Sequence, residues 1–265
     1  MLELNTSVLE ETIDPSNWEE FRQTGHRMLD DMINYIQRSG ERKVWQPIPQ
    51  SVKLALDTNM PLQENSLDDV YESFQQNILP YALGNTHPRF WGWVCGNGSA
   101  TGMLADMLAS AMNPTTSFGE HADLYVEKQV LDWTKEMYGF PKSSSGILTT
   151  GASLANVLAL TTARNFFNKD IRKKGIKNLD GQLVMYASAE THSCLQKAVE
   201  LLGIGSENLR KIAVDENYEV RIDLLEEQIQ RDKANGFLPF CIVGNAGTVN
   251  TGAIDGLEIL AAIAK

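Results

Sequence analysis

Over roughly the first 140 residues, apolar positions recur every three to four residues, the spacing of amphipathic helices. The clearest stripe runs from Phe21 to Ile36, follows a cap at Ser16 or Asn17, and ends at Gly40. Three prolines between residues 41 and 63 disfavour helix there and predict an extended connector. Further helices are predicted over residues 66–79, stopped by Pro80, and 123–138, ended by Gly139.

From Gly146 onward the pattern changes to short apolar runs that alternate with helical stripes. The predicted strands are 147–150, 183–187, 209–214 and 240–243, and the predicted helices are 153–168, 193–202, 222–234 and 256–265. Apolar strands alternating with helices predict an α/β fold with a parallel sheet covered on both faces. Ligands in such sheets bind beyond the carboxyl ends of the strands, so functional residues are expected there.

Composition and charge narrow the class of protein. The 265 residues carry a net charge of −11, which argues against nucleic acid and anionic membranes as main partners. The start of the chain lacks the pattern of a signal peptide, and no apolar run approaches the ~20 residues of a membrane helix. Cys95, Cys194 and Cys241 are widely spaced, which predicts reduced thiols in a cytoplasmic protein and neither disulfides nor a metal site.

The first predicted strand ends at Gly151, Ala152 and Ser153, where a helix begins. Free N–H groups and the helix dipole favour a phosphate at such a position, and the small side chains leave room for it. An ordinary strand–helix connection capped by Ser153 explains the same residues.

Two other predicted strands are followed by residues that can carry chemistry. His192 follows the second strand, and a loop with Gly247, Thr248 and Gly252 follows the fourth. Taken singly, the histidine is a cap or surface residue and the glycines are turn residues, but together they place three candidate groups at one rim of the sheet.

An aromatic segment precedes the sheet. Phe90, Trp91 and Trp93 lie within four positions and are bordered by glycines. Such a segment can line an apolar pocket, and it can equally be a strand in the core or in a dimer interface. The glycine spacing departs from a dinucleotide-binding loop, which argues against a nicotinamide or flavin cofactor.

An ordered series of motifs resembles the pyridoxal-phosphate-dependent group II amino acid decarboxylases, the family of the aromatic-L-amino-acid, histidine and glutamate decarboxylases. The motifs are His87-Pro88, Met103-Leu-Ala-Asp-Met-Leu108, Gly151-Ala-Ser153 with Ala155-Asn156, Thr191-His-Ser193, and the run from Gly247 to Asp255. The resemblance implies an α/β fold of the type I pyridoxal-phosphate enzymes. It divides the chain into an N-terminal helical dimerisation segment, 1–85, and the first part of the cofactor-binding large domain, 86–265.

The resemblance also implies roles for single residues. Ala152 and Ser153 correspond to the phosphate contacts of pyridoxal 5'-phosphate, and His192 to the catalytic histidine that stacks on its ring. Thr248 corresponds to a threonine near the ring. Trp93, Val94 and Cys95 correspond to residues of the substrate pocket, in part across a dimer interface, but they are less aromatic than in aromatic decarboxylases and lack a proline. The substrate is an L-amino acid, which loses CO2 while the cofactor ring takes up the electron pair.

Two family residues have no counterpart among these 265 residues: the aspartate that binds the ring nitrogen and the lysine that binds the cofactor covalently. Asp255 and Lys265 belong to other segments and are not expected to replace them. We therefore expect these residues to be the N-terminal portion of a homodimeric enzyme and to be inactive alone. The alternatives are another pyridoxal-phosphate lyase or aminotransferase of the same fold, and a non-catalytic fragment.

Overall fold

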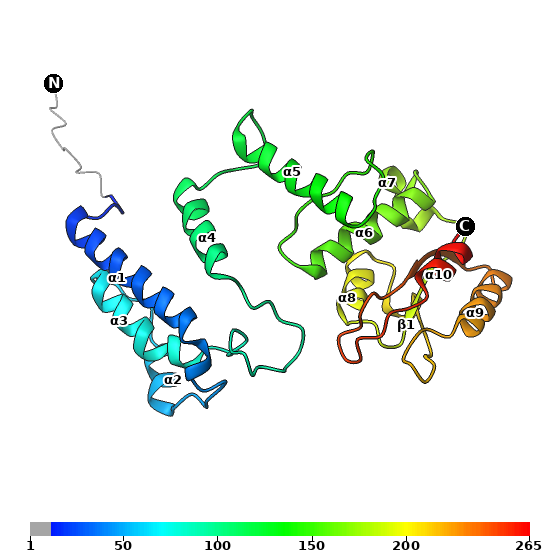
Figure 1. Cartoon of the computed structure of the whole chain (residues 1–265). Helices are drawn as coiled ribbons and strands as arrows, with labels where there is room; N and C mark the ends of the chain where they lie inside the picture. The colour runs from blue at the N-terminus through cyan, green and yellow to red at the C-terminus, as the bar shows by residue number, and fades with distance from the viewer. Residues whose placement is uncertain (1–11) are drawn as a thin grey trace, which may run out of the picture. The chain divides into compact units, whose positions relative to one another are not determined.

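The computed structural model describes residues 12–265 and contains two compact units (Figure 1). One unit ends at Asn113 and the other spans Pro114–Lys265. The division expected at residue 85 falls inside the first unit. The roles expected for the two parts, dimerisation for 1–85 and cofactor binding for 86–265, stay predictions.

The first unit is helical. Its α-helices are α1 (Trp18–Gln37), α2 (Gln50–Leu56), α3 (Leu67–Asn77) and α4 (Ala100–Met112), with short 3-10 turns at Ser39–Glu41 and Leu79–Tyr81. The side chain of Asn17 accepts hydrogen bonds from the amides of Glu19 and Glu20, so Asn17 is the cap that starts α1. Ser66 starts α3 in the same way through the amide of Asp69, at 3.1 Å.

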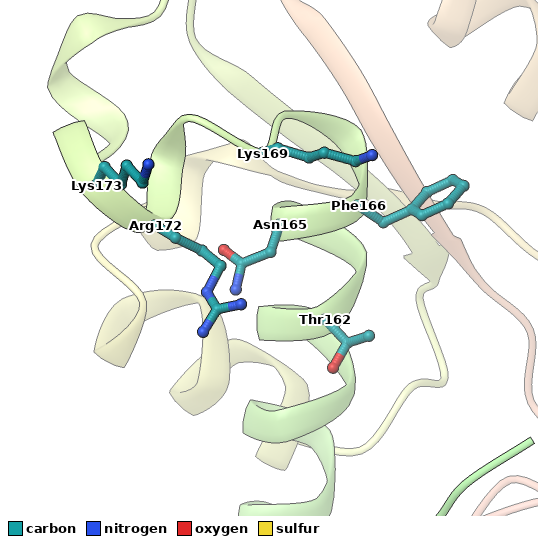
Figure 2. A pocket seen from close by; sticks show the side chains of 6 residues that line it. All are labelled: Thr162, Asn165, Phe166, Lys169, Arg172 and Lys173. Atoms are coloured by element: carbon teal, nitrogen blue, oxygen red, sulfur yellow. The ribbon is translucent and has the colours of Figure 1, made fainter.

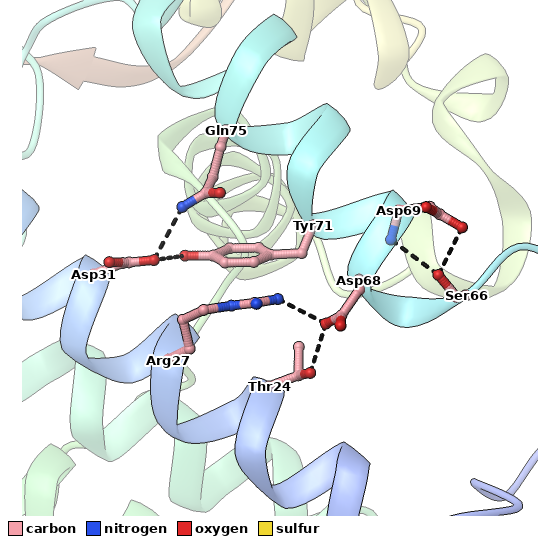
Figure 3. A network of polar contacts seen from close by, with 8 residues as sticks. All are labelled: Thr24, Arg27, Asp31, Ser66, Asp68, Asp69, Tyr71 and Gln75. Carbon is pink, nitrogen blue, oxygen red and sulfur yellow. Dashed lines mark hydrogen bonds and ion pairs between the residues drawn. The ribbon is translucent and has the colours of Figure 1, made fainter.

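Side-chain contacts join α1 to α3 in a parallel arrangement (Figure 3). Asp68 on α3 accepts from Thr24 and Arg27 on α1, both at 2.6 Å. One to two turns further on, Asp31 accepts from the Tyr71 hydroxyl at 2.7 Å and from Gln75 at 2.9 Å. Tyr71 is buried, so this contact combines a filled apolar position with a satisfied hydroxyl.

The second unit is built on a three-stranded parallel sheet. The strands are β1 (Leu183–Ser188), β2 (Leu209–Ile212) and β3 (Leu238–Val243), in the order β2-β1-β3. All six residues of the central strand β1 are buried, whereas those of the edge strand β3 are half-buried. A near-continuous apolar strand is therefore the central one, as expected for a sheet covered on both sides.

Successive residues of β1 point to opposite faces of the sheet. Leu183, Met185 and Ala187 pack with α6 (Ala152–Phe167) and α8 (Cys194–Leu201), whereas Val184 and Tyr186 pack with α9 (Ile222–Ala234) and α10 (Leu257–Ile263). Figure 1 shows α8 and α9 on opposite sides of β1. The remaining elements of the unit are α5 (Ala122–Met137), α7 (Ile171–Lys174) and 3-10 turns at Ile176–Asn178 and Ser206–Asn208.

Two expectations about the elements are wrong, and one helix was missed. Residues 147–150 form no strand: Ile147 and Leu148 are exposed, and no described strand lies beside them to share hydrogen bonds. The connector expected over 41–63 contains α2, whose first residue directly follows Pro49, so the proline precedes the helix and does not interrupt it. Helix α4 was not predicted, although Ser99 caps it and Asn113, with φ 42°, ends it.

None of the helices in residues 12–265 is both long enough and apolar enough to cross a membrane.

Candidate active site

Helix α6 begins without a side-chain cap. Its N-cap position is Gly151, and the amides of Ala152, Ser153 and Leu154 have no acceptor among residues 12–265. Ser153 is the second residue of the helix, so it is not the cap. A Cβ added to Gly151 would meet nothing within 4 Å, so there is open space beside this glycine at the start of the helix. The start of α6 therefore offers free donors and a serine hydroxyl to an anion.

The loop after β1 lies next to the start of α6. The side-chain nitrogen (Nδ2) of Asn156, in the first turns of α6, donates to the sulfur of Cys194 at 3.4 Å. Cys194 is the first residue of α8, and its backbone N–H donates to Nδ1 of His192 at 3.2 Å. Two successive hydrogen bonds thus connect the phosphate-binding candidate to His192. The structure brings Ala152, Ser153 and His192 to the same rim, as expected from the sequence.

The hydrogen bond to Nδ1 also defines the state of His192. Because Nδ1 accepts a hydrogen bond from the Cys194 backbone N–H, Nε2 is the nitrogen that carries the proton in the neutral tautomer. The ring is exposed, and its Nε2 has no hydrogen-bond partner among the described residues. His192 therefore presents a flat, fixed ring and one free N–H to a ligand.

A buried carboxylate fastens the loop after β3. Asp255 is 2% exposed and accepts from the backbone and the side-chain amide of Asn245, at 2.7 and 2.9 Å, and from the backbone of Val220 at 2.9 Å. Asn245 in turn donates to the Thr191 hydroxyl at 3.0 Å. The loops after β1 and β3 are therefore held together, and Asp255 holds the second loop through three hydrogen bonds.

Thr248 lies within this second loop and is buried. Its hydroxyl contacts that of Thr251 at 2.6 Å and accepts from the backbone of Ala253 at 3.2 Å. These bonds close a short antiparallel turn in which Gly247 has φ 99°. Thr248 shapes the loop at the rim, and its expected contact with a cofactor stays a prediction.

Trp93, Val94 and Cys95 belong to the first unit and lie in a loop before α4. All three are exposed, and Trp93 has a left-handed backbone with φ 55°, unusual for a bulky residue. The expected alternative of a core strand is wrong, because these residues neither pair nor become buried in the chain. Their role in a substrate pocket or a dimer interface stays a prediction.

The residues that sequence reasoning missed at this site are Asn156 and Asp255 as positioning groups. Both were quoted only as parts of motifs. Their roles depend on partners 38 and 35 residues away in the chain, Cys194 and Val220. Local patterns carry no signal for such pairs.

The site fits a phosphate-bearing cofactor. Free helix amides, a serine hydroxyl and open space form a phosphate cradle, with an exposed imidazole on the adjoining loop. Among the described residues no group of three or more His, Cys, Asp or Glu is arranged to hold a metal ion. A parallel sheet with a free imidazole after its central strand and a phosphate cradle on the neighbouring helix defines a class: α/β proteins that bind phosphorylated cofactors at the rim of the sheet.

The family follows from comparison with known sequences. The pyridoxal-dependent decarboxylase conserved domain matches residues 49–265, so the chain belongs to the pyridoxal-dependent decarboxylase family, whose cofactor is pyridoxal 5'-phosphate. It is 31% identical over 247 residues to an aromatic-L-amino-acid decarboxylase of Bacillus atrophaeus, covering 92% of this chain and 50% of that protein. It is 34% identical over 267 residues to tryptophan decarboxylase 2 of Oryza sativa subsp. japonica, covering 97% and 53%.

Solved structures show the same fold. Catharanthus roseus tryptophan decarboxylase in complex with L-tryptophan matches with a TM-score of 0.83 and 25% identity, over 95% of this chain and 54% of that one. The Oryza sativa TDC with PLP matches with a TM-score of 0.84 and 23% identity, over 96% and 56%. The fold is that of the type I pyridoxal-phosphate enzymes. The chain spans about half the length of the curated relatives it matches.

Proposed function

We propose that the whole protein is a carboxy-lyase that removes CO2 from an L-amino acid with pyridoxal 5'-phosphate. The observation that carries this proposal is the uncapped start of α6, joined through Asn156 and Cys194 to His192. The family and its relatives, which include aromatic, tryptophan and tyrosine decarboxylases, support the reaction type.

We assign the chain's own residues as follows. The amides of Ala152 and Ser153 and the Ser153 hydroxyl bind the phosphate, because they are free donors at the positive end of a helix dipole. His192 packs its exposed ring against the cofactor ring, and its Nε2 holds a proton that it can deliver to the substrate α-carbon. Thr248 lines the rim. When bound, the cofactor supplies an electron sink for the pair left by the departing CO2.

The positioning residues keep these groups in place. Asp255 and Asn245 hold the loop after β3, and the Thr191 hydroxyl ties that loop to the one carrying His192. This network, built on the carboxylate of Asp255, fixes the positions of the two loops before a ligand binds. Less conformational entropy is then lost on binding.

We further propose that the whole protein is a cytoplasmic homodimer, with Trp93, Val94 and Cys95 lining the substrate pocket partly across the interface. The three cysteines form no disulfide, which supports a reducing compartment. The exposed Trp93 and Val94, together with the exposed Leu104, Met107 and Met112 on α4, support a covering partner. Sedimentation of the whole protein tests the dimer: a single species with the mass of one subunit overturns it.

The experiment that tests the cofactor site compares pyridoxal 5'-phosphate with pyridoxal, which lacks the phosphate. Equilibrium dialysis against the 265-residue chain should show tighter binding of the phosphorylated form. Ser153→Ala should weaken that binding about ten-fold, since a hydrogen bond to a charged group contributes ~1.5–3 kcal/mol and the backbone donors remain. Pyridoxal binding should not change.

The matched control is Ser145→Ala, an exposed serine outside any helix and with no side-chain hydrogen bond in the described chain. Equal affinity for the two ligands, or equal losses in the two serine variants, contradicts the assignment. Decarboxylation is tested separately by CO2 release from a panel of L-amino acids with the whole protein; amino transfer without CO2 release points to the aminotransferase alternative.

A further inference from the structure

The second unit carries a basic hollow at the far end of α6, away from the cofactor site (Figure 2). The hollow has a volume of about 690 Å³. It is lined by Thr162, Asn165, Phe166, Lys169, Arg172 and Lys173. Helix α6 is 16 residues long, so its two ends are about 24 Å apart at 1.5 Å per residue. The hollow and the start of α6 are therefore separate places on one helix.

The chain holds the lining residues in place from two sides. Thr162, Asn165 and Phe166 have the i, i+3, i+4 spacing that puts them on one face of α6. After α6 ends, the Asn168 side chain accepts from the backbone of Asp170 at 2.9 Å and forms the turn into α7. Ile171, the first residue of α7, is buried in the same core cluster as Leu160. The short helix is thus anchored, with Arg172 and Lys173 outside the core.

Three cations of the hollow have no anionic partner. Lys169, Arg172 and Lys173 form no ion pair with any carboxylate of residues 12–265, whereas the adjacent Lys174 pairs with Asp170 at 2.6 Å. The chain as a whole is acidic, with a net charge of −11. Three unpaired positive charges around one hollow repel each other, and an anion between them would offset that repulsion.

The polar groups of the hollow are mainly donors. Figure 2 shows the Arg172 guanidinium turned toward the side chain of Asn165. Asn165 lies on α6, about one turn after Thr162. Its nitrogen is drawn on the side of the Arg172 guanidinium, and its oxygen is buried without a partner in the described chain. The Thr162 hydroxyl donates to the Leu158 carbonyl at 2.9 Å. Arginine's planar fork, two ammonium groups and an amide nitrogen suit the oxygens of a phosphate.

We propose that this hollow binds a small anion that carries at least two phosphate groups. A single carboxylate would leave most of the positive charge unpaired, and a nucleic acid would meet the net negative charge of the rest of the chain. The ring of Phe166, which is 86% exposed at the edge of the hollow, adds a stacking surface if the anion is a nucleotide. The anion can be a free diphosphate or a nucleotide, and the group common to both is the diphosphate.

The test is isothermal titration calorimetry of the 265-residue chain with sodium pyrophosphate, at an ionic strength held constant with sodium chloride. Arg172→Gln and Lys169→Gln should each weaken binding at least ten-fold. Lys174→Gln is the matched control, because Lys174 lies on the same short helix but is already paired with Asp170, and it should leave binding unchanged. Circular dichroism melting of each variant checks that the fold is retained.

Further arms separate the possible results. ATP binding tighter than pyrophosphate, with the difference removed by Phe166→Ala, identifies a nucleotide as the source; equal affinity identifies the diphosphate alone. The proposal is overturned if pyrophosphate does not bind, if Lys174→Gln weakens binding as much as Arg172→Gln, or if binding depends on Ser153 and not on Arg172.

Discussion

His192 illustrates how much a single side chain can contribute to chemistry without contributing to the fold. Its ring is exposed and makes one hydrogen bond, from the Cys194 amide at 3.2 Å. We therefore expect His192→Gln to change the free energy of unfolding by no more than ~0.5 kcal/mol, the usual range for exposed substitutions. In the whole protein the same change should lower kcat by about 10²–10⁴, the range of general acid–base catalysis.

Steady-state CO2 release and denaturant unfolding measure the two effects separately. His121→Gln is a matched control, since His121 pairs with Asp123 at 3.0 Å in another part of the second unit. A normal kcat in the His192 variant would remove this residue from the proposed mechanism.

At the residue scale, the sequence predicted the positions at the rim better than the role of each side chain. Ser153 lies where expected, but as the second residue of α6 and not as its cap. Thr248 lies at the rim, but its hydroxyl is used inside its own loop. A motif identifies which residues follow a strand; hydrogen bonds to distant partners determine whether a hydroxyl is free, and these depend on the folded chain.

Among the secondary-structure elements, α9 is fastened to the sheet by one buried carboxylate. Asp232 on α9 accepts from the Tyr186 hydroxyl of β1 at 3.0 Å and from Arg210 of β2 at 3.1 Å. Burial disfavours its charge, but hydrogen bonding from Arg210, Gln228 and Tyr186 and the charge of Arg210 outweigh burial and lower the pKa of Asp232. Asp232→Asn should destabilise the chain by about 3 kcal/mol, because removing one partner of a buried pair leaves the other charge uncompensated.

Urea unfolding measures this loss, and Asp223→Asn is the control, since Asp223 pairs with Arg221 on the exposed start of the same helix and should change stability little. The lowered pKa of Asp232 means that its contribution is present above pH ~4 and is lost as the pH falls through the folded-state value. The asparagine variant should therefore lose less stability on acidification than the wild type. Equal losses in the two variants would show that Asp232 is not the fastening group.

The contact between α1 and α3 predicts an alkaline transition. Burial and the hydrogen bond to Asp31 raise the pKa of Tyr71 to about 12. A raised pKa stabilises the fold below the unfolded value of ~10, and this stabilisation is lost between pH 10 and 12. Tyr71→Phe should cost about 1 kcal/mol at neutral pH, the net contribution of one hydrogen bond, and should weaken the alkaline loss of stability.

Tyrosinate absorbance at 295 nm follows the ionisation directly, and one late-titrating group should disappear in Tyr71→Phe. Tyr125→Phe is the control, because Tyr125 is 62% exposed. The prediction fails if the two variants have the same titration curve.

Helices that begin at a clear cap were predicted well, and the one false strand was not, for a physical reason. An amphipathic helix satisfies its own backbone, so the caps at Asn17 and Ser66 and the stripes between caps are enough to predict α1 and α3. A strand needs a neighbour. Residues 183–187 have strands on both sides and were predicted correctly, whereas residues 147–150 have none and are not a strand.

For the molecule as a whole, the segment between the two units should be an early site of proteolysis. Residues 113–120 are exposed and outside any helix or strand, and Phe118 is 74% exposed. Chymotrypsin should therefore cut after Phe118, and also in the exposed loop with Trp91 and Trp93, before it cuts within the sheet. Mass spectrometry of short digests identifies the cuts, and Phe118→Ser should abolish one of them without affecting the other. First cuts inside β1 would contradict the division into two units.

For the whole molecule, the sequence predicted the fold class and the family correctly. It did not predict where the chain divides into compact units. The alternation of strands and helices predicted a covered parallel sheet, and the motifs predicted the decarboxylase family, which the domain match confirms. The boundary between the compact units falls between residues 113 and 114, and not at Gly146, where the pattern of the sequence changes. Compactness depends on contacts such as those between α6 and α8, which no local window of sequence contains.

The strand order β2-β1-β3 has a consequence during synthesis on the ribosome. The central strand β1 ends at Ser188, but its partner on one side, β3, begins only at Leu238, about 50 residues later. At the usual 5–20 residues per second, the mostly apolar β1 waits about 3–10 s for its last neighbour. A short apolar strand with a free edge is prone to pair with other chains during that interval. Production of this protein in cells should therefore depend on chaperones that protect nascent chains.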